Sequence, residues 1–328
     1  MKHPRVSVII PLKDTLPYFK KCCDSLFVQT CSDMEIIIVD DASSQDISGF
    51  LDRYDHTQKL VYLRNEVSLG PGACRNQGLD IAQGQYISFC DSDDWVDLNF
   101  YEHVCNHLDK TTADLAMVSM KREFPFRNKD NETYMCHYSQ HYTLNPEIAI
   151  HAMCGDYDNI GIKVASACMN KIYRHDFLQR INARFEEGVY YQGTMFSIFT
   201  FLRAAKINCI PNVTYHHFRR KGSIIQSFDV KHIKDFGSCC QTLRKYFVDM
   251  DQFETYKDSF YRKCIFLFDL VIQEIFEYVP SEDLKKKYIQ QMLEQCLNAV
   301  SAEEWLTFLD AETIRRHLQP DIHDTTLY

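Results

Sequence analysis

Gln85-Tyr86-Ile87-Ser88-Phe89-Cys90 is a short apolar run that leads directly into the acidic stretch Asp91-Ser92-Asp93-Asp94. Such a run suits a strand buried inside a parallel sheet. Similar apolar runs precede it, and helical patterns separate them. These runs are Val6–Ile10, Glu35–Val39 and Leu60–Leu63. Strands that alternate with helices predict right-handed crossover connections, so the sequence predicts a doubly wound α/β domain with a mostly parallel sheet and helices on both faces.

Acidic residues follow two of the predicted strands. Asp40-Asp41 ends one strand, and the stretch from Asp91 ends another. The carboxyl ends of parallel strands meet at one edge of the sheet, where such folds bind ligands. Asp91 and Asp93 can converge there on a divalent ion, Mg²⁺ or Mn²⁺, which would neutralise a departing diphosphate. Taken alone, the stretch at Asp91 fits a helix cap better than a ligand site, and Asp40-Asp41 fits either, but together they favour a ligand site.

A glycine-rich helix start lies between the two acidic stretches. Gly70-Pro71-Gly72 opens a predicted helix that runs to Ala82 and carries Arg75 in its second turn. The exposed amides of a helix start favour an anion, and an arginine there can bind a phosphate or the edge of a base.

Charge and composition narrow the function classes. The formal net charge of −9 disfavours a broad nucleic-acid surface. The basic run Arg219-Arg220-Lys221 is an exception, which fits a solvated turn, a diphosphate site or an anionic membrane surface. Without a signal peptide or Cys-x-x-Cys spacing, the fourteen cysteines are expected to be free thiols. No apolar stretch is long enough to cross a bilayer, so we expect a cytoplasmic protein, with a peripheral contact at the inner face of the membrane as an open alternative.

The sequence becomes persistently helical beyond Ser227. We therefore predict a catalytic domain over 1–228, with nucleotide-sugar binding in 1–110 and the acceptor side in 111–228, followed by a helical module over 229–328. This module packs on the catalytic domain, forms a homo-oligomer or contacts another partner. The polar stretch Lys121–Gln140 fits a loop or a hairpin insertion.

Taken together, these motifs resemble the inverting family 2 glycosyltransferases, which have the GT-A fold. The resemblance is carried by ordered segments of the first hundred residues and weakens toward Phe228. The segments are Val6–Pro11, Ser25–Thr30, Glu35–Ser43, Ala73–Asn76 and Phe89–Trp95.

The resemblance implies roles for individual residues. Pro11 and Asp40 would flank the nucleotide base, and Arg75 would lie near the base or the diphosphate. Asp91 would face the ribose and donor, and Asp93 would bind the metal. Asp41 and Ser92 belong to the same expected donor site. The family usually has Pro-x-Tyr-Asn after the first strand, whereas this chain has Asp14 in place of the asparagine, which can still accept a hydrogen bond.

The residue that would act as catalytic base departs from the family pattern. The family places an acidic pair after a lead similar to Arg184–Tyr191, but this chain has Gln192-Gly193 there. A neutral amide cannot take the proton of an acceptor hydroxyl. Three alternatives stay open: Glu186 or Glu187 acts as the base, His216 or His217 does so, or transfer activity is lost. Of the two adjacent histidines, only one can face the site and complete a metal shell or contact the diphosphate, because neighbours in a strand point to opposite faces.

The sequence thus predicts a hexosyltransferase that moves a sugar from a UDP-sugar, or another nucleotide sugar, to a hydroxyl of a polysaccharide or glycolipid. The family implies polysaccharide biosynthesis at the bacterial surface. One alternative is a donor-binding pseudoenzyme or scaffold. A nucleotidyltransferase is less favoured, because the residues after the first strand contain no glycine-rich phosphate loop.

Overall fold

A computed structural model describes residues 3–54, 59–124, 133–156, 160–220, 227–300 and 303–304. The chain divides into two compact units. The first comprises the described residues of 1–153 and 157–219, and the second those of 154–156 and of 220 onward. The predicted boundary near Phe228 and the assignment of functions to the two parts stay predictions.

The strands of the described residues form one mixed sheet in the first unit, in the order β3-β2-β1-β4-β9-β6-β10-β5, with β7 beside β6 and β8 beside β10. Their bounds are β1 Val6–Leu12, β2 Met34–Asp40, β3 Lys59–Arg64, β4 Tyr86–Phe89, β5 Trp95–Val96, β6 Leu115–Glu123, β7 Thr133–Cys136, β8 Tyr142–Leu144, β9 Lys171–Arg174 and β10 Ile207–Phe218.

The predicted parallel core is confirmed. Strands β3, β2, β1 and β4 pair in parallel, and β1 and β2 are buried almost throughout, which explains their continuous apolar sequences. Beyond β4 the pairing changes, because β9 runs antiparallel to both β4 and β6. Strand β10 then pairs with β6 in parallel.

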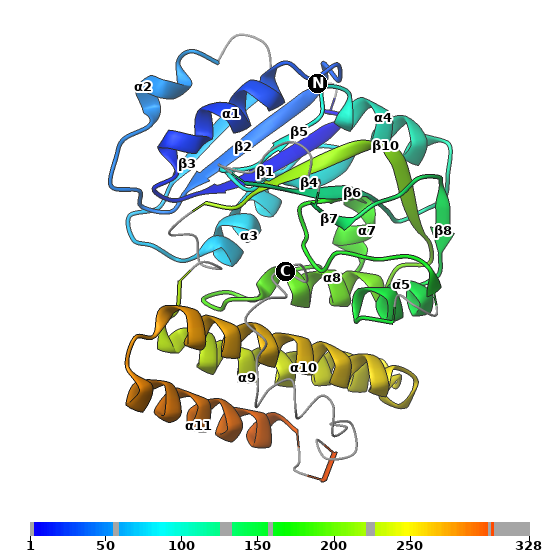
Figure 1. The fold of residues 1–328 in the computed structure, drawn as a ribbon. Helices are drawn as coiled ribbons and strands as arrows, with labels where there is room; N and C mark the ends of the chain where they lie inside the picture. Colours follow the sequence, from blue (N-terminus) through cyan, green and yellow to red (C-terminus); the bar gives the residue numbers. More distant parts are fainter. Residues whose placement is uncertain are drawn as a thin grey trace. The chain divides into compact units, whose positions relative to one another are not determined.

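Helices cover both faces of the parallel strands. In Figure 1, α1 (Leu16–Phe27) and α3 (Pro71–Ile81) lie on opposite faces, as right-handed crossovers in opposite directions require. The other helices whose bounds lie in the described part of this unit are α2 Ser48–Leu51, α4 Phe100–Asp109, α5 Pro146–Met153, α7 His175–Arg180 and α8 Gln192–Phe201.

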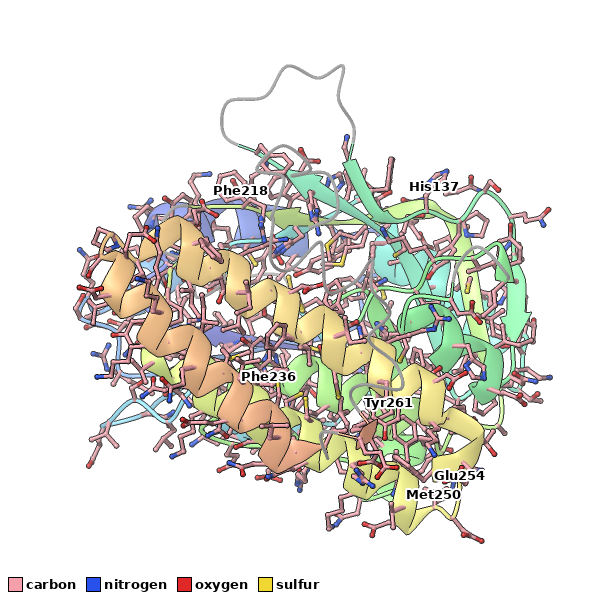
Figure 2. The ribbon with its side chains drawn as sticks, turned by 60° about the horizontal axis from the view of Figure 1, so that its bottom comes forward. His137, Phe218, Phe236, Met250, Glu254 and Tyr261 are labelled. Atoms are coloured by element: carbon pink, nitrogen blue, oxygen red, sulfur yellow. The ribbon has the colours of Figure 1, made fainter. Side chains whose placement is uncertain are left out.

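The second unit is helical, as predicted for the C-terminal region. It contains α9 (Val230–Asp249), α10 (Phe253–Tyr278) and α11 (Glu282–Ala299), each of which packs on the other two. Figure 2 labels Phe236 on α9, and Met250 and Glu254 at the turn into α10. Ser281 caps α11 by accepting a hydrogen bond from the amide of Leu284.

Two further expectations can be compared with the structure. The segment Lys121–Gln140 contains the antiparallel pair β6–β7, which favours a hairpin over a loop, although residues 125–132 lie outside the described part.

All fourteen cysteines are free, as expected, and all are buried. Within the described chain, no helix combines the length and the apolar character needed to span a membrane.

Candidate active site

The three acids and one serine after β4 have different surroundings. Asp91 accepts a hydrogen bond from Nη2 of Arg75 at 2.5 Å, and its carboxylate keeps 27% of its surface exposed. Ser92 is buried, and its hydroxyl lies 2.7 Å from the hydroxyl of Thr15, the N-cap residue of α1. Asp93 is half-buried. Asp91 and Asp93 are therefore the carboxylates at this strand end that keep contact with solvent.

Asp94 is fully buried and serves as an anchor. Its oxygens accept hydrogen bonds from the hydroxyl of Tyr215, at 2.6 Å, and from the amide of Phe218, at 2.8 Å. Tyr215 also lies 3.1 Å from the amide nitrogen of Asp91. These contacts tie the acidic turn to the end of β10. The sequence alone does not reveal this role, because the partners are more than 120 residues apart.

The two histidines of β10 face opposite sides, as strand geometry requires. His217 lies with Nδ1 3.4 Å from Oδ2 of Asp94. Burial opposes the charge of His217, but Asp94 and Asp91 outweigh it and raise the pKa of this imidazole. His217 is therefore the histidine that faces the acidic turn.

His216 lies in a separate group of side chains. Its ring nitrogens contact carboxylate oxygens of Glu123, at 2.8 Å, and Asp97, at 3.0 Å, and its ring stacks on Trp95. Burial opposes its charge, but the two carboxylates raise its pKa. Because both nitrogens are occupied, the predicted roles of His216 as base or metal ligand receive no support from its placement.

Asp40, the last residue of β2, and Asp41, the next residue, hold neighbouring segments in place. Asp40 has no exposed side-chain surface, and it accepts hydrogen bonds from the amide of Ser43, the hydroxyl of Tyr62 and the guanidinium of Arg64. Pro11 is half-buried on β1, in register with the end of β2. Asp14 accepts hydrogen bonds from both the amide and the hydroxyl of Ser44, which lower its pKa. The donor contacts predicted for Pro11, Asp14 and Asp40 stay predictions.

Asp41 positions the start of α3. Its carboxylate accepts hydrogen bonds from the hydroxyl of Ser68 and from the amides of Leu69 and Gly70. Gly70 has a φ of 88°, a left-handed conformation that favours glycine, and it is the N-cap of α3. Asp41 thus fixes the turn before α3, the helix from which Arg75 projects toward Asp91. The predicted donor contact of Asp41 stays a prediction.

Arg75 is a buried cation with unused hydrogen-bonding capacity. Only 3% of the residue is exposed, and Nη2 binds Asp91. Its Nε and Nη1 atoms are buried without a hydrogen-bond partner in the described chain. The same is true of Oε1 of Gln192. Buried polar atoms without partners are costly, so these atoms indicate a place where a polar ligand binds.

The loop that precedes α8 is fastened to α3. Nδ2 of Asn76 donates to the carbonyl of Phe185, at 3.0 Å, and to Oε1 of Glu187, at 2.8 Å. At Gly72 a Cβ atom would lie 2.4 Å from the carbonyl oxygen of Glu186, so only glycine permits this approach. The same Cβ position lies 3.6 Å from Cγ of Gln192. The first turn of α3 therefore meets both the Glu186-Glu187 pair and the position of the family base.

The carboxylates of the acidic turn suit a divalent ion when substrate phosphates supply further ligands. Among the described residues, no group of three His, Cys, Asp or Glu side chains is arranged to hold a metal. Mg²⁺ commonly needs only one or two carboxylates when substrate phosphates supply further ligands. Asp91 and Asp93 can provide these carboxylates, whereas Asp94 is occupied by Tyr215 and Phe218. The site thus suits an ion that binds together with a diphosphate.

Comparison with known proteins identifies the family. The family model described as Glycosyl transferase family 2 matches residues 7–181, which is more than half of the chain. The chain belongs to glycosyl transferase family 2. This family 2 glycosyltransferase is 27% identical to EpsH of Bacillus subtilis over 263 residues, which cover 78% of this chain and 73% of EpsH.

Solved structures support the same fold. Residues 1–349 of TarS from Staphylococcus aureus match with a TM-score of 0.70 at 19% identity, covering 92% of this chain and 82% of that one. TarS has also been solved with UDP-GlcNAc. The mannosyltransferase PcManGT from Pyrobaculum calidifontis, in complex with GDP-Man and Mn²⁺, matches with a TM-score of 0.54 at 14% identity and covers 98% of this chain and 89% of that one. The predicted GT-A fold is confirmed, and the comparisons lend no support to a pseudoenzyme or a nucleotidyltransferase.

Proposed function

We propose that this glycosyltransferase moves a sugar from a UDP-sugar to a hydroxyl of a polysaccharide or glycolipid, with inversion and with Mg²⁺ or Mn²⁺. The observation that carries the proposal is the buried Arg75 beside Asp91, because its two unpartnered nitrogens suit an anionic, hydrogen-bond-accepting ligand. The TarS complex with UDP-GlcNAc supports a uridine donor, and the PcManGT complex supports a divalent ion.

The residues of the acidic turn would hold the donor phosphates and the ion. Asp91 and Asp93 would supply carboxylate ligands, with His217 beside them, and Arg75 would donate hydrogen bonds to the diphosphate or base. When bound, the ion supplies Lewis-acid stabilisation of the leaving diphosphate. Asp94, Asp41 and Asn76 would act as positioning residues, because each holds a segment that carries one of these groups.

We propose Glu187 as the catalytic base. Its carboxylate is exposed and is oriented by Asn76, and its loop meets the same turn of α3 as Gln192. In the reaction, Glu187 takes the proton of the acceptor hydroxyl. The hydroxyl oxygen bonds to the anomeric carbon, and the bond from that carbon to the nucleoside diphosphate breaks.

The test of donor and reaction is release of nucleotide from a panel of UDP- and GDP-sugars, with Mn²⁺, with Mg²⁺ and with a chelator. We expect a UDP-sugar to be used and the chelator to stop its use. UDP that neither binds nor is released under any of these conditions would refute the proposed donor.

The test of the base compares two neighbouring substitutions. Glu187→Gln should lower kcat by about 100-fold or more, because base catalysis contributes about 10²–10⁴-fold, while the Kd for UDP stays unchanged. Glu186→Gln is the matched control and should keep most of the activity. If Glu187→Gln is as active as the control, Glu187 is not the base.

A gain-of-function variant tests whether position 193, in the place of the family's acidic pair, can supply the base. A Cβ at Gly193 would lie 3.6 Å from Sγ of Cys168, an ordinary contact, so Gly193→Asp can be accommodated. Full activity in the Gly193→Asp, Glu187→Gln double variant would show that position 193 can supply the base.

A further inference from the structure

Two arginine side chains gather at the carboxyl end of β6, outside the acidic turn. Arg122 is the penultimate residue of β6 and is in register with His217 on β10. Arg219 follows β10, and its amide donates a hydrogen bond to the carbonyl of Glu123. Side chains of parallel strands that are in register share a face, and so do alternate residues along a strand, so Arg122, His217 and Arg219 project to the same side of the sheet.

Arg122 is the least compensated member of this cluster. Its Nε atom is buried and has no hydrogen-bond partner in the part of the chain that the structure describes. Burial and the neighbouring Arg219 both disfavour its charge, and they lower the pKa of Arg122 to about 10. A partly buried guanidinium beside another cation is costly unless an anion joins it.

Lys163 extends the cluster toward solvent. It is an exposed residue, and partial desolvation of its ammonium group together with the charge of Arg122 lowers its pKa. Lys163 comes from the segment before β9, so the cations are supplied by three separate parts of the chain. Their convergence brings three positive charges together in a protein whose formal net charge is −9.

The position of the cluster indicates which substrate it serves. Arg219 lies near enough to His217 for its charge to oppose part of the rise in the pKa of that histidine, so the cluster borders the acidic turn. The donor diphosphate already has partners there in Arg75 and an ion at Asp91 and Asp93, under the function proposed above. The cluster comes from residues beyond 110, on the side that we assign to the acceptor, and it opens to solvent at Lys163.

We propose that the acceptor carries a phosphate group, and that Arg122, Arg219 and Lys163 bind this phosphate beside the reacting hydroxyl. Arginine supplies planar hydrogen-bond donors that match phosphate oxygens, and a lysine at the exposed edge adds a point charge. The inference rests on the proposed function, because it names the chemical class of the acceptor for the same site.

The experiment uses the full chain with UDP and Mn²⁺ at saturation, so that a phosphate cannot occupy the donor position. Glycerol 3-phosphate is titrated as the probe, glycerol serves as the neutral control, and binding is followed by calorimetry. We expect glycerol 3-phosphate to bind, to bind more weakly at high salt, and glycerol not to bind. No binding of glycerol 3-phosphate to the UDP-saturated protein would overturn the proposal.

Variants assign the binding to the cluster. Arg122→Gln should weaken the probe about tenfold or more, because it removes charge-assisted hydrogen bonds, while the Kd for UDP stays unchanged. Lys163→Gln should weaken the probe by a smaller factor, and because Lys163 is exposed this variant tests the proposal even if Arg122→Gln fails to fold. Lys110→Gln makes the same change of charge at an exposed position at the C-terminal end of α4, which precedes the opposite end of β6, and should have no effect.

Two results separate this inference from the proposed function. Parallel loss of UDP and probe binding in Arg122→Gln would mean that the cluster serves the donor diphosphate, which overturns the proposal. Equal behaviour of Lys163→Gln and Lys110→Gln would also overturn it. Failure of the proposed function would instead appear as absence of UDP binding to the unsubstituted protein.

Discussion

Asp41 shows how one carboxylate can control the geometry of a site that lies several residues away. It holds Ser68, Leu69 and Gly70 before α3, and α3 in turn carries Arg75 to Asp91. Burial raises the pKa of Asp41, but these hydrogen bonds outweigh burial and lower it. The ionised carboxylate is therefore a stabilising element of the folded protein.

The pH dependence of stability tests this role. Because the pKa of Asp41 is lower in the folded protein than in the unfolded chain, its contribution is fully present above the unfolded value of about 4 and is lost as the pH falls through the folded value. Asp41→Asn should lower the free energy of unfolding by about 1–3 kcal/mol at pH 7. In urea titrations, the difference from the unsubstituted protein should shrink below about pH 4. A difference that is constant from pH 7 to pH 3 contradicts this assignment, and Asp52→Asn, at an exposed position, is the control.

Single residues also mark the limit of prediction from the sequence. The acidic stretch at Asp91 could be located, because an apolar strand followed by acids is a local pattern. The anchoring of Asp94 by Tyr215 and the meeting of Arg122 with Lys163 and Arg219 could not, because they depend on the order of strands in the sheet. The choice between His216 and His217 needed the register of β10 against its neighbours.

At the scale of elements, the buried parallel strands were predictable and the short ones were not. The sequences of β1 and β2 are continuous, mostly apolar runs. Such runs fit few structures other than a strand that is buried on both faces. Strand β9 reads Lys171-Ile172-Tyr173-Arg174 and gives no such signal, although it joins the two parts of the sheet. Its position is set by pairing with β4 and β6, which is information that four residues do not contain.

The packing of α3 on β1 gives a second prediction. A Cβ at Gly78 would lie 2.4 Å from Cγ2 of Ile9, so Gly78→Ala should displace α3 and lower the free energy of unfolding by about 1–3 kcal/mol. Gly49→Ala in α2 is the matched control, since nothing lies within 4 Å of its Cβ position. It should leave stability unchanged or raise it by up to about 1 kcal/mol. Equal thermal stability of the two variants would contradict the close packing of α3.

At the scale of the whole molecule, thiols are distributed through both units and are buried everywhere. None of the fourteen cysteines is exposed or forms a disulfide. Burial raises the pKa of thiols in both units, to about 11 for Cys154 and to about 12 for Cys74 and Cys209. The thiolate is the reactive form of cysteine. Folding therefore makes these side chains inert, because it shields them from reagents and because it disfavours the thiolate.

Thiol labelling therefore reports on the integrity of the fold. With an aromatic disulfide reagent at pH 8, the native protein should show almost no fast-reacting thiol, and the protein in guanidinium chloride should show all fourteen. Protection should be lost at the same denaturant concentration as the circular dichroism signal. One or more thiols that react fast before unfolding would show that a part of the structure opens separately.

Residues Cys154–Asp156 belong with the helical unit, although they stand in the middle of the sequence. In that unit the thiol of Cys154 lies near Lys263 of α10. The helical unit is therefore not one continuous cassette. C-terminal units can be exchanged between relatives to transfer acceptor preference or assembly. A single crossover near residue 220 would then place the helices of one protein against residues 154–156 of the other. A chimera that carries a second splice at 154–156 would keep the native neighbours together.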